Sequence, residues 1–124
     1  MNAERRTRNA ELKQRTFEFG LRVVRLVQSL PKTASTTVLG RQLLRCGTSV
    51  GANYRAATRG RSRADFIAKL GIAEEECDET IYWIDMLTPL KLIRAQRTQD
   101  LRGEAEQLLA IMVSSIKTAR RNKE

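Results

Sequence analysis

Arginines gather at two places in the first half of the sequence, near the N-terminus and around a turn at residues 59–62. A guanidinium group binds phosphate oxygens through paired hydrogen bonds and can stack on an unpaired base. No zinc finger, RNA-recognition submotif or Gly-rich phosphate loop accompanies them. The pattern predicts sequence-tolerant binding of phosphate groups, as in a nucleic-acid backbone. The candidate nucleic-acid-binding residues are Arg55, Arg59, Arg61, Arg63, Arg5, Arg6 and Arg8.

The distribution of charge supports an anionic partner for this half of the chain. Residues 1–63 hold 14 Lys and Arg against three acidic residues, a net charge of +11. Residues 64–124 hold nine against 11, a net charge of −2, so the whole chain carries +9. Nucleic acid is the commonest partner of so basic a surface. The alternative is a solvated basic face without a ligand.

The side chains that usually perform catalysis are scarce. The sequence has no histidine and two cysteines, Cys46 and Cys77, which are too few for a zinc site. Neither a Ser-His nor a Cys-His pair is possible, and acid/base chemistry would need carboxylates with shifted pKa values. We therefore expect a protein that is not an enzyme and has neither metal nor cofactor, with both cysteines reduced in the core.

Apolar residues recur at spacings of three and four in four stretches, which predicts four helices. Pro31 ends the first, and the hydroxyl-rich segment 33–37 caps the second. Gly60 suits a left-handed C-terminal position, and Ser62 and Asp65 have capping-box spacing ahead of the third helix. Pro89 ends or bends that helix, and Thr98 is a candidate cap for the fourth.

Four helices of similar length with short connections predict an all-α fold, an antiparallel up-down-up-down four-helix bundle. We expect a single domain over residues 1–124, with residues 1–8 as a mobile basic arm and residues 120–124 as a frayed tail. Counting back equally from the turn near Arg61 and Ser62 sets Cys46 opposite Cys77. Their side chains should lie at neighbouring levels of the core, without a disulfide.

Small residues interrupt the second predicted helix, although a glycine in a helix costs about 0.5–1 kcal/mol relative to alanine. Close approach of a helix within the bundle could offset that cost, and so could a second subunit. Asn53 is either a solvated residue or a buried polar group that fixes register. Glutamates of the third helix could pair with Arg45 or Arg55. The candidate packing or oligomer-interface residues are Gly47, Ser49, Gly51, Ala52, Asn53, Glu76, Glu79, Tyr82 and Trp83.

The middle of the chain contains a recognisable series of motifs. They are Ser-Val-Gly-Ala-Asn-Tyr at 49–54, Arg-Ser-x-x-Asp-Phe at 61–66, Lys-Leu at 69–70 and Glu-x-x-Glu-Thr-x-Tyr-Trp at 76–83. This stretch resembles the bacterial four-helix-bundle family encoded in intervening sequences of large-subunit ribosomal RNA genes. The resemblance implies a homopentamer with a basic surface and an association with RNA, without an established enzymatic activity.

A second group of bundles is similar in fold, the accessory variability determinants of diversity-generating retroelements. That resemblance implies a pentamer that binds a reverse transcriptase and RNA, so a retroelement role stays open as the alternative. A protein-interaction scaffold is a further alternative. The sequence has neither an apolar signal segment nor a run of 18 apolar residues. We expect a cytoplasmic location without membrane contact.

Overall fold

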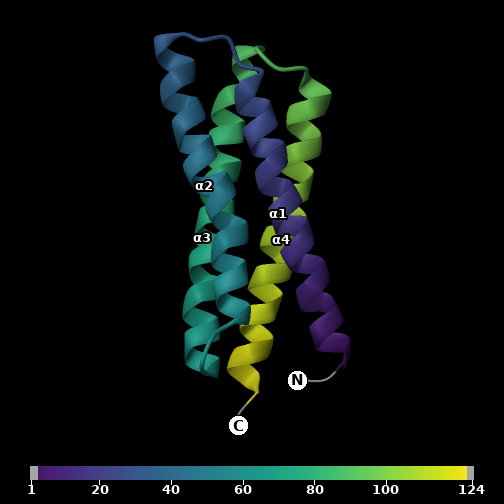
Figure 1. Cartoon of the computed structure of the whole chain (residues 1–124). Helices are drawn as coiled ribbons and strands as arrows, with labels where there is room; N and C mark the ends of the chain where they lie inside the picture. The colour runs from purple at the N-terminus through teal and green to yellow at the C-terminus, as the bar shows by residue number, and fades with distance from the viewer. Residues whose placement is uncertain (1–2, 123–124) are drawn as a thin grey trace.

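The computed structural model describes residues 3–122, and its regular elements over that range are helices (Figure 1). They are α1 (Ala3–Gln28), α2 (Ala34–Thr58), α3 (Arg63–Leu87), the short 3₁₀ helix η1 (Thr88–Leu90) and α4 (Ala95–Arg121). The four α-helices run alternately up and down, which confirms the predicted bundle. Helix α2 packs extensively on α1 and α3, whereas α1 and α4 have the least extensive contact of the neighbouring helices.

Two of the helix starts are built as the sequence predicts. The Thr33 hydroxyl accepts a hydrogen bond from the Thr36 amide (3.2 Å), and the Thr36 hydroxyl accepts one from the Thr33 amide (2.9 Å). The Ser62 hydroxyl accepts from the Asp65 amide at 3.0 Å. The Asp65 carboxylate, however, accepts from the amide of Arg61 at 3.1 Å, one residue earlier than a full capping box requires.

Two other predicted helix ends are wrong. No glycine in residues 3–122 has a positive φ, so Gly60 is not left-handed. Gly60 is instead confined by space, because a Cβ there would lie 3.0 Å from the Ala57 carbonyl oxygen and 3.1 Å from the Phe66 amide nitrogen. Helix α4 begins at Ala95 without a side-chain cap, and Thr98 lies inside its first turn with its hydroxyl donated to the Ala95 carbonyl (3.0 Å).

The N-terminal arginines belong to a helix rather than to a separate arm, since residues 3–8 form the first turns of α1. The hydroxyl of buried Tyr54, on α2, donates to the Asn9 side-chain carbonyl at 3.1 Å and ties the start of α1 to the end of α2. At the other end of the chain, α4 continues through Arg121. Residues 1–2 of the expected arm and 123–124 of the expected tail lie outside the described residues.

All four helices contribute side chains to one core. Its fully buried members include Phe19 on α1, Leu43 on α2, Ile84 on α3 and Leu108 on α4. Cys46 and Cys77 are also fully buried and carry free thiols. They lie close enough for the Cys46 thiol to contribute to the raised pKa of Cys77, although burial is the main cause. This proximity agrees with the neighbouring core levels predicted for the two cysteines.

Candidate nucleic-acid surface

The alternating direction of the helices brings three distant segments to one end of the molecule. The start of α1, the turn between α2 and α3, and the end of α4 all lie at the bottom of Figure 1, where both chain termini are marked. We call this region the basic end. Its cationic residues are Arg5, Arg6, Arg8, Arg55, Arg59, Arg61, Arg63, Lys117, Arg120 and Arg121.

The turn at the basic end is held by backbone and carboxylate contacts that leave its arginines outward. The Asp65 carboxylate accepts a hydrogen bond from the Arg61 amide and forms an ion pair with Lys69 at 3.2 Å. These two contacts lower the pKa of Asp65, the backbone hydrogen bond more than the ammonium group. The nearest carboxylate of the turn is thus ionised and already occupied at neutral pH.

The guanidinium groups of the turn remain available to an external anion. Arg59, Arg61 and Arg63 are exposed, and none of them forms an ion pair with a carboxylate of residues 3–122. Arg55 is likewise exposed, on the last turn of α2. Because exposed charges interact weakly one by one, useful affinity for a phosphate chain requires several of them together.

Three cations of the basic end were not among the residues expected to bind RNA. Lys117, Arg120 and Arg121 stand on the last turns of α4, where positive charge also suits the helix dipole. The sequence already contained the signal for their position, because an up-down-up-down order places the end of the fourth helix at the same end of the bundle as the turn between the second and third. A motif within one segment does not show that the end of α4 and the turn between α2 and α3 lie at the same end of the bundle.

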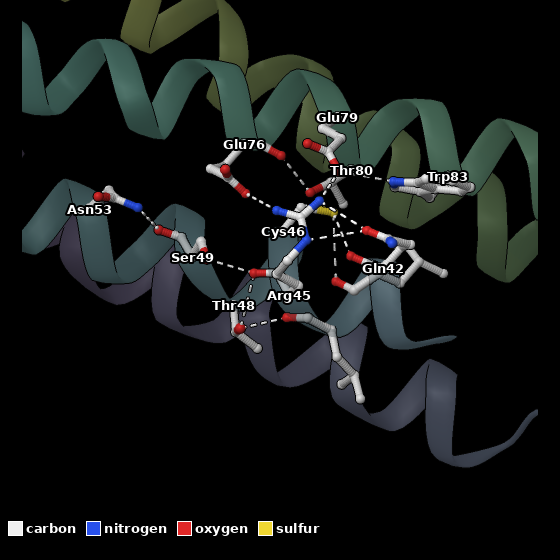
Figure 2. Close-up of polar contacts among 12 residues, drawn as sticks. Gln42, Arg45, Cys46, Thr48, Ser49, Asn53, Glu76, Glu79, Thr80 and Trp83 are labelled. Carbon is white, nitrogen blue, oxygen red and sulfur yellow. Dashed lines mark hydrogen bonds and ion pairs between the residues drawn. The ribbon is translucent and has the colours of Figure 1, made fainter. Parts of the chain in front are cut away.

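Helices α2 and α3 meet through a polar cluster centred on Arg45 (Figure 2). Its guanidinium donates to Glu76 at 3.3 Å and to Glu79, and also contacts the Gln42 side chain. The Trp83 indole donates to the same Glu79 carboxylate at 3.1 Å. Figure 2 shows these side chains converging between the two helices. Glu76 and Glu79 are therefore engaged within one chain, on a partly exposed face.

Two of the small residues of α2 face α1. A Cβ at Gly47 would lie 2.8 Å from the γ carbons of Val23, and a Cβ at Gly51 would lie 3.1 Å from the Thr16 carbonyl oxygen. The glycines thus allow the backbones of α1 and α2 to approach closely. This contact offsets the cost of helical glycine within a single chain.

The other small and polar candidates on α2 point elsewhere. Ala52 is exposed and Ser49 donates its hydroxyl to the Arg45 carbonyl at 2.6 Å. Asn53 is partly buried and donates to the Ser49 carbonyl at 2.9 Å, one turn back along its own helix. This hydrogen bond stays within α2, so the Asn53 side-chain amide does not connect α2 to another helix.

The aromatic candidates on α3 differ in exposure. Trp83 packs partly against the core, whereas Tyr82 is 56% exposed. Their rings meet edge to face with centroids 5.0 Å apart. Tyr82 lies on the outward face of α3 together with Ile72 and Met86, which are also exposed. This face carries apolar area that the single chain leaves in contact with solvent.

The described residues contain no helix that is both long and apolar enough to cross a membrane. Residues 3–122 also lack any group of three His, Cys, Asp or Glu side chains arranged to hold a metal ion.

The fold defines the class of protein first: an all-α four-helix bundle. The model of the 23S rRNA-intervening sequence protein family matches residues 8–114. The chain belongs to this family.

A solved structure extends the comparison. It is a protein of unknown function from the S23 ribosomal protein family of Bacteroides thetaiotaomicron, solved at 1.70 Å. The two chains are 36% identical, with a TM-score of 0.81 over 88% of this chain and 97% of the other. None of the curated proteins matches the sequence.

Proposed function

We propose that this protein is a non-enzymatic RNA-associated bundle that binds phosphate backbones through the basic end. One observation carries the proposal: cations from three segments of the chain gather at the same end of the bundle. The family name, which refers to sequences within 23S rRNA, agrees with RNA as the anion. Contacts of this kind position a protein on a nucleic acid without reading its sequence.

The geometry of the turn supports the proposal because Asp65 is already engaged with Lys69 and the Arg61 amide. A phosphate approaching Arg59 or Arg63 therefore replaces water rather than a protein carboxylate. Each phosphate contact releases counterions, so affinity should fall steeply with salt.

Electrophoretic mobility shift with a structured RNA across a salt series tests this function. We expect binding at low salt that weakens as salt rises, and weaker binding by a variant with Arg59, Arg61 and Arg63 replaced by alanine. Binding that is absent at low salt, or that is insensitive to salt, contradicts the proposal. A pull-down repeated after nuclease treatment distinguishes RNA from a protein partner such as a reverse transcriptase, because an RNA-bridged association disappears.

We also propose that the protein is a homo-oligomer located in the cytoplasm. Its resemblance to the intervening-sequence family and to the retroelement accessory proteins favours a pentamer. The exposed outward face of α3, with Ile72, Tyr82 and Met86, supports such an assembly. A ring would repeat the basic end and raise its effective concentration toward RNA. Size-exclusion chromatography with light scattering tests this assembly. Replacing Tyr82 with lysine should lower the oligomer mass, whereas Val38→Lys, on the exposed surface of α2, should leave it unchanged. A monomeric wild-type protein contradicts the assembly.

A further inference from the structure

A cavity of about 230 Å³ lies between α1 and α4, at the end of the bundle opposite the basic end. It is lined by Arg22, Arg25 and Leu26 from α1 and by Arg97 and Leu101 from α4. The two leucines are buried and the three arginines are exposed. The lining thus combines three cationic side chains with two apolar ones.

None of these arginines forms an ion pair with a carboxylate of residues 3–122. The ion pairs of α1 and α4 instead involve Arg15 with Glu104 and Arg102 with Asp85 and Glu106. Three like charges around one hollow repel each other, and no ion pair within residues 3–122 offsets that repulsion. An external anion would remove that cost.

One of the three is already held in position. Arg97 donates from Nη1 to the Ser29 hydroxyl at 2.9 Å, which joins the start of α4 to the end of α1. The first turn of α4 contains no acidic residue and has no side-chain cap, so the positive end of its dipole adds to the field. An anion here would bridge α1 and α4, the neighbouring helices with the least extensive contact.

We propose that this cavity binds a compact phosphate carrying at least two negative charges. A tetrahedral phosphate offers several acceptor oxygens to guanidinium forks, whereas a single carboxylate saturates one fork. A phosphate monoester carries about −1.5 to −2 charges near neutral pH, which suits three cations better than a singly charged anion does. The cavity holds the phosphate, and the rest of any larger ligand lies outside it.

The phosphate has two chemical sources, a free diphosphate or the terminal phosphate of an RNA chain. Only the second source rests on the proposed function. The site is separate from the basic end, so the two can fail independently.

Calorimetric titration with inorganic pyrophosphate at low salt tests the site. We expect wild-type protein to bind, and Arg25→Gln and Arg97→Gln each to weaken binding at least about tenfold, the value of a charged hydrogen bond. Arg41→Gln is the matched control, because Arg41 is exposed on α2, outside the cavity, and forms no ion pair with a described residue. Wild-type protein that fails to bind, or equal losses in Arg41→Gln and Arg97→Gln, overturns the proposal.

A second arm identifies the source by comparing one RNA with a 5′-phosphate and with a 5′-hydroxyl. Tighter binding of the phosphorylated RNA, with the preference lost in Arg97→Gln, identifies an RNA end. Equal binding of both RNAs by a protein that binds pyrophosphate identifies a free phosphate. Replacing Arg59, Arg61 and Arg63 by alanine should leave pyrophosphate binding unchanged, which separates this site from the basic end.

Discussion

Gly47 of α2 lies directly against Val23 of α1, so closely that a Cβ at position 47 would be 2.8 Å from both γ carbons of the valine. Val23 is fully buried, and a β-branched side chain on a helix has one strongly preferred rotamer. The Val23 side chain therefore has little freedom to rotate away from position 47. This contact sets how closely the first two helices pack.

Replacing Gly47 with alanine should therefore destabilise the protein by about 1–3 kcal/mol, the usual cost of overpacking. Gly103→Ala is the matched control, since a Cβ at that helical position meets nothing within 4 Å. The control should gain about 0.5–1 kcal/mol from helix propensity. Urea unfolding followed by circular dichroism gives both values, and equal effects at the two glycines would contradict the close α1–α2 contact.

The Glu79 carboxylate accepts hydrogen bonds from both Arg45 and Trp83. Because the pair is partly exposed, Glu79→Ala should cost less than about 1 kcal/mol of stability. It should also expose the indole, and Trp83 is the one tryptophan of the chain, so its fluorescence emission should shift to longer wavelength. Unchanged emission would show that the carboxylate does not contact the indole in solution.

Burial raises the pKa of Tyr54 to about 12, above the usual value near 10. The neutral phenol is thus favoured in the folded state, and this contribution to stability is complete below pH 10 and is lost as pH rises towards 12. Tyr54→Phe removes both the titration and the hydrogen bond to Asn9, at a cost of about 0.5–1.5 kcal/mol near pH 7. The difference in unfolding free energy between wild type and Tyr54→Phe should therefore shrink as pH rises from 7 to 11.5. A difference that stays constant with pH would contradict the raised pKa of Tyr54.

The cysteine thiols should be inert in the folded protein. Burial raises the pKa of Cys46 and raises that of Cys77 to about 12, and both side chains are fully buried. A thiolate is required for reaction with a disulfide reagent. We expect two thiols to react rapidly in denaturant and neither to react rapidly without it. Fast labelling of the native protein would contradict the packing of the α2–α3 core.

Local signals in the sequence predicted several features correctly because their causes are local. Pro31, the Thr33 cap and the Ser62 cap each act within a few residues, so their positions follow from the chain alone. The opposition of Cys46 and Cys77 followed from counting back along two antiparallel helices from one turn.

Features that depend on three-dimensional neighbours were harder to predict. The cost of glycine in a helix indicated that Gly47 has a close neighbour, but not that Val23 of α1 supplies it. The sequence suggested that Gly60 is a left-handed helix cap. In the structure a side chain at this position is instead excluded by the Ala57 carbonyl and by the Phe66 amide across the turn. The convergence of Arg121 with the α2–α3 turn follows from topology, which no single motif contains.

The central claim, that the basic end binds RNA phosphates, is tested most directly by the slope of log affinity against log salt. Each phosphate contact contributes about −0.7 to −0.9 to that slope. Wild-type protein should show a steep negative slope with a structured RNA. Replacing Arg59, Arg61 and Arg63 with alanine should make the slope shallower by about 2, whereas Arg41→Ala should leave it nearly unchanged. Identical slopes for wild type and the triple variant would contradict the claim.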